Sequence, residues 1–123
     1  RVLFRSQKLS LAAVELAESL GARCIVVITR RGVMADLVCN CRPVYSDIYA
    51  FTNVSQARRT MTLGRGIRPF RIAFSQDPEK TLQTAFNVLK EREGFQSDEK
   101  VVVISDVLAG SGKIDAIQIR HLP

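Results

Sequence analysis

The chain has 123 residues, of which 46% are apolar and 24% are charged, and its formal net charge at pH 7 is +6. This length is enough for one ordinary domain, and the apolar fraction is enough for a packed core, which excludes a disordered tail. No apolar run approaches the ~18 to 20 residues that a membrane span needs, so we expect one globular domain without a membrane partner.

The first predicted helix spans residues 9–20, where apolar residues recur at helical spacing along one face, and Gly21 ends it. The chain opens at Arg1 without an initiator methionine, so we expect a fragment of a longer protein. We take residues 1–8 as a connector or as vector-derived residues, and residues 9–123 as one domain.

A strand, a helix and a second strand follow. Residues 24–28 form a continuous β-branched run, which is typical of a central strand covered on both faces of a parallel sheet. Helical spacing resumes from Met34 to Cys41 and stops before Pro43. Residues 47–52 are predicted as the second strand.

The middle of the chain is predicted as a short helix and a short strand. Ser55 is a natural N-cap for a helix that runs through about Leu63. Residues 67–74 form an extended segment, and Pro69 within it indicates a short strand at the edge of a sheet.

The last part of the chain opens with a clearly marked helix. Residues 77–79 supply an N-cap aspartate, a proline at the first helical position and a first-turn acid, and the helix runs down to Gly94. Residues 101–104 form a buried strand, residues 110–112 a Gly-rich loop and residues 114–119 a last strand.

This alternation of helices and strands predicts an α/β domain. We expect three layers: a mainly parallel sheet of about five strands, with the last strand antiparallel, and helices on both faces of the sheet.

Cysteine and histidine limit the chemistry of the chain. Cys24, Cys39 and Cys41 lack the paired spacing of zinc ligands, and the only histidine is His121, near the end. We therefore expect no metal, no other cofactor and no Cys/His catalytic pair in this chain. The three cysteines fit reduced structural thiols of a cytoplasmic protein, and a catalytic nucleophile is the alternative.

The basic residues are concentrated in the first part of the chain. Residues 1–71 carry 12 basic and 4 acidic side chains, whereas residues 72–123 carry 6 and 8. Thirteen of the 18 cations are arginine, which suits phosphate and carboxylate groups. This pattern favours an anionic partner or an acidic protein neighbour, and the alternative is a solvated basic surface.

Five arginines could follow a nucleic-acid backbone: Arg58, Arg59, Arg65, Arg68 and Arg71. The aromatic residues that a single-strand binder places between its basic residues are missing, so we expect no nucleic-acid partner.

Two loops are candidates for anion binding, because ligands of open α/β sheets lie beyond the carboxyl ends of the strands. A hydroxyl, a glycine and the free N–H groups of a helix can hold a phosphate, and arginines add charged hydrogen bonds. The alternatives are an ordinary capped helix at the first loop and a solvated lysine at the second. The predicted phosphate-binding residues are Thr29, Arg30, Arg31, Gly32, Gly110, Ser111, Gly112 and Lys113.

The order of five segments resembles the C-terminal domain of pyruvate kinase. The family shows a T-x-x-G-x-[ST]-A loop, a Y/C-R-P motif, an A-R pair before L-x-R-G-[IV]-x-P, and a late Gly-rich loop. The matching segments here are residues 29–35, 41–43, 57–58, 63–69 and 110–112.

The resemblance implies a domain for subunit assembly and effector binding that does not itself transfer phosphate. It places the catalytic lysine, the magnesium-binding carboxylates and the potassium site in a separate barrel domain. The complete enzyme would transfer phosphate from phosphoenolpyruvate to ADP in glycolysis. The implied partners are this barrel domain, further copies forming a tetramer, and a sugar bisphosphate held by residues 29–32 and the effector loop 110–112.

Three positions depart from the members that respond to a sugar bisphosphate, and the chain also lacks the tryptophan that responsive animal forms carry before the long helix. Met34 stands where those members carry a serine or threonine, Arg31 replaces another small hydroxyl residue, and Thr81 stands about where they carry an arginine. Arg30 and Arg31 therefore serve this effector, a different anion or only the subunit interface. The rival functions are a free-standing small α/β protein that binds anions or nucleic acid, and a small phosphatase-like enzyme.

Overall fold

Helices and strands alternate along the chain, as predicted. The computed structural model describes residues 2–62, 66–105 and 115–123. The helices in these ranges are α1 (Val2–Leu20), α2 (Val33–Asn40), α3 (Ser55–Thr62) and α4 (Pro78–Arg92). The strands are β1 (Cys24–Ile28), β2 (Asp47–Thr52), β3 (Ile67–Arg71), β4 (Lys100–Ser105) and β5 (Ala116–His121).

The strands form one sheet in the order β3-β2-β1-β4-β5. The pairs β1 with β2, β1 with β4 and β2 with β3 are parallel, and β5 runs antiparallel to β4. β1 lies at the centre with all five residues buried, which explains its unbroken apolar sequence. The predicted mixed sheet and its central strand are confirmed.

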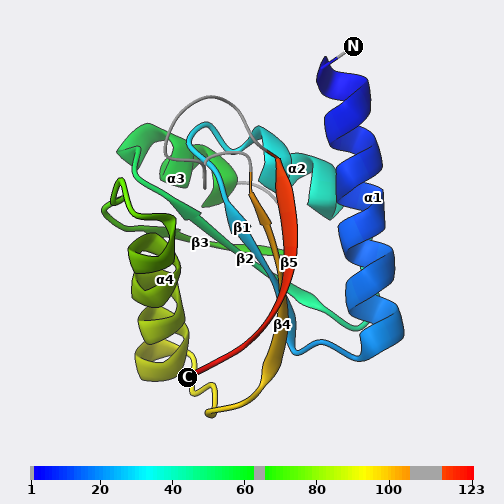
Figure 1. Ribbon diagram of the computed structural model, residues 1–123. Coiled ribbons are helices and arrows are strands. Elements are labelled where there is room, and N and C mark those ends of the chain that lie inside the picture. Colours follow the sequence, from blue (N-terminus) through cyan, green and yellow to red (C-terminus); the bar gives the residue numbers. More distant parts are fainter. Residues whose placement is uncertain (1, 63–65, 106–114) are drawn as a thin grey trace.

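The helices cover both faces of the sheet, so the three-layer prediction is confirmed (Figure 1). The chain passes from β1 to β2 to β3 in one direction, and α1, α2 and α3 supply the core on that face through residues such as Ala13, Val38 and Met61. It then returns across the sheet to β4, and α4 packs Leu82 and Phe86 against the opposite face.

α1 is longer than the apolar pattern predicts, because it begins at Val2 rather than Leu9. The added turns place Arg5 and Ser6 four and three residues before Leu9, so polar residues interrupt the apolar stripe there. They are held by other contacts: Arg5 pairs with Asp115 at 3.1 Å, and the Ser10 hydroxyl donates to the Ser6 carbonyl at 2.8 Å.

The two later helices begin in different ways. Asp77 caps α4 as predicted, since its carboxylate accepts from the N–H of Glu79 at 3.1 Å. α3 begins at Ser55 itself, so Ser55 is a residue of the helix and not its predicted cap. The preceding turn is organised by Thr52, whose hydroxyl accepts from the N–H of Val54 at 3.1 Å.

β3 is an edge strand, as Pro69 predicted. The N–H of Ile72, just past the strand, donates to the Thr52 carbonyl on β2 at 2.8 Å. Since N–H groups alternate in direction along a strand, those of residues 68 and 70 also face β2, and position 69 faces outward. Pro69 therefore costs the sheet no hydrogen bond.

β5 is the other edge strand, and its outward positions keep their donors. The N–H of Leu122 donates to the Glu99 carbonyl at 3.0 Å on the β4 side. By the same alternation residues 116, 118 and 120 face β4, and the N–H groups of Ile117, Ile119 and His121 face away from the sheet.

Candidate anion-binding site

The carboxyl ends of β1 and β4 lie side by side at the point where the chain direction across the sheet reverses. Ile28 at the end of β1 is in register with Ser105 at the end of β4. Such a point is where open α/β sheets bind ligands. The first predicted loop, residues 29–32, follows Ile28 directly. Residues 106–114, which follow Ser105, lie outside the described residues.

Residues 29–32 form a tight turn that is fixed by its own hydrogen bonds. The N–H of Thr29 continues the sheet by donating to the Phe51 carbonyl at 3.0 Å. The buried hydroxyl of Thr29 accepts from the N–H of Gly32 at 3.2 Å. The carbonyl of Arg30 accepts from the Thr52 hydroxyl at 2.8 Å. The backbone is thus held at the N-terminus of α2, as a preformed turn.

Gly32 is required by both its backbone conformation and its surroundings. It precedes α2 with φ of 89°, in the left-handed region that residues with a side chain rarely adopt. A Cβ atom placed on it would lie 3.0 Å from Cγ of Met61 on α3. The turn therefore contacts α3 directly.

Arg30 and Arg31 supply the positive charge of this turn. Both side chains are exposed, and within the described residues neither forms an ion pair. Two unpaired guanidinium groups beside a helix N-terminus can take a phosphate or a carboxylate. The predicted residues Thr29, Arg30, Arg31 and Gly32 thus form one turn.

The second half of the predicted site lies outside the described residues. It comprises Gly110, Ser111, Gly112 and Lys113. The described chain ends at Ser105 and resumes at Asp115, and Ala116 is in register with Ser105. Both ends of the segment are therefore anchored at the carboxyl edge of the sheet, beside the Thr29–Gly32 turn.

Two of the three positions that depart from the effector-responsive pattern are occupied by buried structural residues. Met34 is 2% exposed, and its sulfur lies 3.3 Å from the Ser10 hydroxyl between α2 and α1. Thr81 is 3% exposed, and its hydroxyl accepts from the N–H of Ser75 at 2.9 Å. Neither side chain is available to a ligand at the turn.

One unpaired acceptor beside the turn was missed by the sequence analysis. Among the residues that the structure describes, Asn53 Oδ1 is the one buried side-chain oxygen or nitrogen without a hydrogen-bond partner. It follows Thr52, whose hydroxyl bonds the turn. A buried acceptor without a donor is costly, so this oxygen suits a donor from a ligand or water. No pattern in the sequence marks it.

The arginines predicted as one group are divided by the fold. Arg68 turns to α4 and pairs with Glu93 at 2.9 Å, and Arg65 lies outside the described ranges. Arg58, Arg59 and Arg71 line a hollow of about 370 Å³ with Ser55, Phe70 and Arg92. We call this the arginine hollow. Arg92 was missed because it comes from a distant helix.

A second hollow, of about 720 Å³, lies at the amino ends of β2 and β3. The loop beside it presents Val44 and Tyr45, which are 76% and 83% exposed. Glu18 on α1 holds this loop by accepting from the N–H of Tyr45 at 3.1 Å and from the Ser46 hydroxyl at 3.0 Å. Partial burial alone would raise the pKa of Glu18, but these hydrogen bonds lower it below its ordinary value.

The cysteines carry no sign of a reactive site. None of the three forms a disulfide, and burial raises the pKa of the Cys24 and Cys41 thiols, which disfavours the thiolate. In the described part of the chain, no cluster of His, Cys, Asp and Glu could hold a metal ion. No helix there is long and apolar enough to cross a membrane.

Comparison with known proteins gives one family. The family model described as "Pyruvate kinase, alpha/beta domain" matches residues 7–120. Chloroplastic pyruvate kinase isozyme A of Ricinus communis is 35% identical over 118 residues, which are 96% of this chain and 19% of that protein. The Nicotiana tabacum isozyme A is 34% identical over 118 residues, with the same shares. This chain thus spans about a fifth of the length of these curated relatives.

Solved structures share the fold. Cryptosporidium parvum pyruvate kinase in complex with ADP superposes with a TM-score of 0.85 at 24% identity, covering 96% of this chain and 24% of that one. A crystal structure of the same organism's enzyme gives a TM-score of 0.81 at 22% identity, covering 96% of this chain and 22% of that one.

Proposed function

The chain belongs to the pyruvate kinase family, as its α/β domain, and from this premise we propose that it binds an anionic effector and joins the subunits of a longer enzyme. The longer protein would transfer phosphate from phosphoenolpyruvate to ADP, giving pyruvate and ATP in glycolysis. We assign this reaction to the remainder of the protein, because the chain spans only 19% of its relatives.

The observation that supports effector binding is the arrangement at the carboxyl ends of β1 and β4. The turn at residues 29–32 is preformed and carries two arginines without an ion-pair partner in the described ranges. The segment with Gly110, Ser111, Gly112 and Lys113 starts and ends beside it. A sugar bisphosphate between the two loops would place one phosphate on Arg30 and Arg31.

The test replaces both arginines by alanine in the intact protein and measures fructose 1,6-bisphosphate binding by titration calorimetry. Each charged hydrogen bond contributes on the order of 1.5 to 3 kcal/mol, so the Arg30→Ala/Arg31→Ala variant should bind at least tenfold more weakly. Arg71→Ala/Arg92→Ala is the matched control, since it removes the same charge elsewhere. Unchanged affinity in the first variant places the effector elsewhere, and a loss in the control alone places it in the arginine hollow.

The chain by itself is proposed to be inactive. Phosphoryl transfer needs metal ions on carboxylates and groups that position both substrates. The described residues hold no metal-binding cluster, so they do not fit the magnesium and potassium that the family implies, and we assign both ions to the barrel domain. Phosphoenolpyruvate-dependent ATP formation by the purified chain, abolished by a substitution within it, would contradict this.

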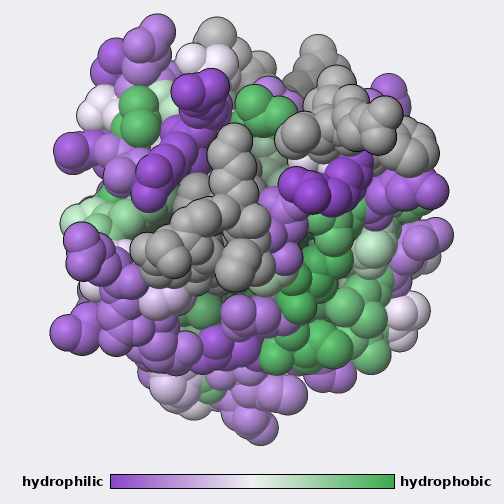
Figure 2. All heavy atoms as spheres, turned by 45° about the horizontal axis from the view of Figure 1, so that its top comes forward, coloured by the Kyte–Doolittle hydropathy of each residue, from purple (hydrophilic) through white to green (hydrophobic). Residues whose placement is uncertain are grey.

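Assembly is the second proposed function, and the β5 edge supports it. Its N–H groups at residues 117, 119 and 121 point away from β4, the direction from which another strand can pair with them. Ile119 is 48% exposed, and apolar residues gather on the side of the molecule where β5 and α1 lie (Figure 2). A second copy meeting β5 about a two-fold axis would pair the edge and cover this surface.

Sedimentation of the intact protein across concentration tests the β5 contact. Ile119→Lys places a charge on the proposed contact and should shift association to higher concentration. Lys80→Ile changes charge on an exposed position of α4 and should leave association unchanged. Equal association in the native protein and Ile119→Lys would show that another surface joins the subunits of the proposed tetramer.

The cytoplasmic location remains a prediction from the cysteines. Six of the relatives are named chloroplastic or plastidial pyruvate kinases of Ricinus communis, Nicotiana tabacum and Arabidopsis thaliana, so a plastid is the competing compartment. Microscopy of the fluorescently tagged full-length protein in its source cells decides between the two.

A further inference from the structure

We propose that the arginine hollow is a second anion-binding site, separate from the Thr29–Gly32 turn, and that it takes a small phosphorylated compound with two or more negative charges. The hollow has a volume of about 370 Å³. Its lining brings four arginines together from three elements: Arg58 and Arg59 from α3, Arg71 from β3 and Arg92 from α4.

The charge of the hollow is not balanced by the residues that line it. The other described lining residues are Ser55 and Phe70, and neither is acidic. Arg59, Arg71 and Arg92 form no ion pair within the described ranges, whereas Arg58 keeps a further contact of its own. Cations that converge on one concave surface repel one another, and their summed field attracts an anion.

One acidic residue that adjoins Arg92 in the sequence is already paired elsewhere. Glu93 follows Arg92 in the sequence, but its carboxylate pairs with Arg68 at 2.9 Å. Ser55 opens the first turn of α3, where backbone N–H groups have no partner within the helix. Arginine forks, a hydroxyl and these N–H groups are the donors that phosphate oxygens prefer.

The shape of the hollow favours a small ligand over a nucleic-acid strand. The arginines surround one concavity from two helices and a strand, so they do not form a continuous track. Phe70 is the one aromatic residue of the described lining, and its ring already stacks on Phe51 at 5.4 Å and on Tyr49 at 6.4 Å. A single-strand site instead presents aromatic rings to successive bases.

The experiment measures tripolyphosphate binding to the intact protein by titration calorimetry, with circular dichroism to confirm folding. Arg71→Gln/Arg92→Gln keeps the length of the side chains approximately and removes two charges. We expect it to weaken the affinity at least tenfold, because each charged hydrogen bond contributes more than that factor. Binding outside the hollow is unchanged between the native protein and the hollow variant, so their difference reports the hollow.

Arg30→Gln/Arg31→Gln is the matched control, and it separates this inference from the proposed effector turn. If the hollow is a site, the hollow variant loses a binding component that the turn variant retains. Equal affinity in the native protein and the hollow variant overturns the inference, whatever the turn variant shows. Oligothymidylate that binds more tightly than tripolyphosphate, and depends on Arg71 and Arg92, overturns it in favour of a nucleic-acid site.

Discussion

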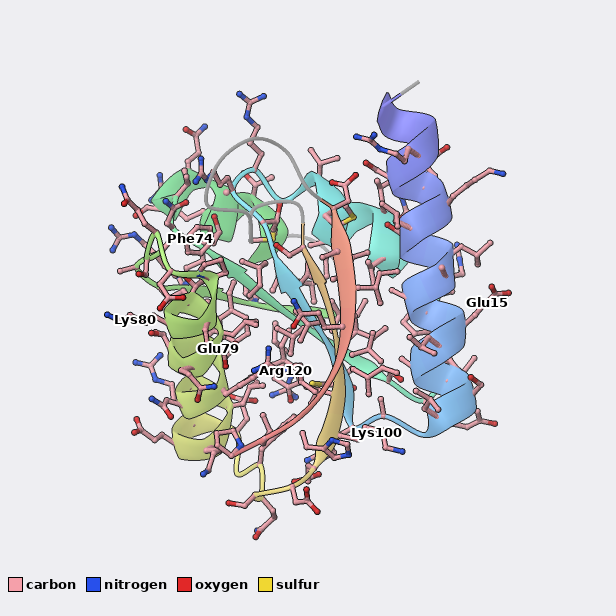
Figure 3. The ribbon with its side chains drawn as sticks, in the orientation of Figure 1. Glu15, Phe74, Glu79, Lys80, Lys100 and Arg120 are labelled. Atoms are coloured by element: carbon pink, nitrogen blue, oxygen red, sulfur yellow. The ribbon has the colours of Figure 1, made fainter. Side chains whose placement is uncertain are left out.

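The two edge strands, β3 and β5, are tied to the domain in the same way and differ in what they present to solvent. Each carries an arginine that pairs with a glutamate at one end of α4: Arg68 with Glu93 at 2.9 Å, and Arg120 with Glu79 at 2.6 Å. Figure 3 shows Arg120 reaching from β5 toward Glu79. The guanidinium groups also lie over aromatic rings, 5.9 Å from Tyr49 and 5.7 Å from Phe86.

The outward sides of the two strands have opposite chemistry. At β3 Pro69 removes the outward donor, and Arg71 adds charge to the arginine hollow. At β5 the outward donors remain, and Ile119 is half exposed. A proline and charges disfavour pairing with another strand, whereas a regular apolar edge favours it. The same kind of arginine–glutamate pair, which we call a tether, therefore holds both edges. One edge suits the proposed anion, and the other suits the proposed second copy.

The largest expected effect comes from placing a proline in β5. Gln118→Pro removes the N–H that faces Val103 on β4, and we expect the free energy of unfolding to fall by about 3 kcal/mol, the scale of a proline inside a regular element. Ile119→Pro removes an outward N–H and should cost less, while weakening association. Urea unfolding compares them, and equal costs would show that the edge is not oriented as described.

Gly32→Ala perturbs α3, which packs against β3, without changing a residue of β3 itself. The alanine must adopt φ of 89° and displace Met61 of α3, so we expect a loss of about 1 to 3 kcal/mol in the free energy of unfolding. Gly94→Ala also has a positive φ but meets no atom within 4 Å, and it isolates the backbone cost. Urea unfolding of both variants should show the larger loss at Gly32, and a smaller one would contradict the contact with α3.

Pro69→Thr gives β3 the outward donor that β5 has. The ladder to β2 stays complete, so the expected loss of stability is about 0.4 to 1 kcal/mol, from the greater freedom of the unfolded chain. Chemical unfolding measures it. A gain in self-association on sedimentation would show that Pro69 keeps this edge unpaired. An unchanged association state would show that the charge of the arginines is enough to keep it unpaired.

The smallest effect is expected at the tether of β5. The hydrogen bonds from Arg120 and then Gln83 lower the pKa of Glu79 below its ordinary value of 4.5. Its contribution is therefore fully present above pH 4.5 and is lost as the pH falls through the lowered value. Glu79 is 53% exposed, so Glu79→Gln should cost about 0.5 kcal/mol near neutral pH. Thermal unfolding against pH should show the stability difference between the native protein and Glu79→Gln vanish in acid. A difference that stays constant with pH would show that the charge of Glu79 is not its cause.

Much of the fold could be predicted because its signals are local. The strands at residues 24–28 and 101–104 are unbroken apolar runs, and the strand at residues 47–52 has an apolar centre. Residues 77–79 mark the start of α4. The first turns of α1 escaped prediction because a distant partner, Asp115, helps to hold them. Ser55 was assigned as a cap from its residue type, whereas the role of Thr52 depends on a hydrogen bond to the distant Arg30 carbonyl.

The candidate site could be predicted only in part, for the same reason. The Thr29–Gly32 turn is continuous in sequence, so its residues could be recognised together. The arginine hollow depends on pairing and on helix placement: Arg68 leaves the group for Glu93, and Arg92 joins it from α4. Neither change leaves a trace in sequence spacing.

Because the Glu18 carboxylate holds the loop at residues 44–46, proton binding to Glu18 is coupled to the position of this loop. Because the pKa of Glu18 is lowered only while it accepts hydrogen bonds from the loop, a proton binds more tightly when the loop is released. By reciprocity, anything that presses the loop onto α1 must expel that proton, and acid must loosen the loop. Since α1 also borders the apolar surface beside β5, acidity acts on the same helix as the proposed subunit contact.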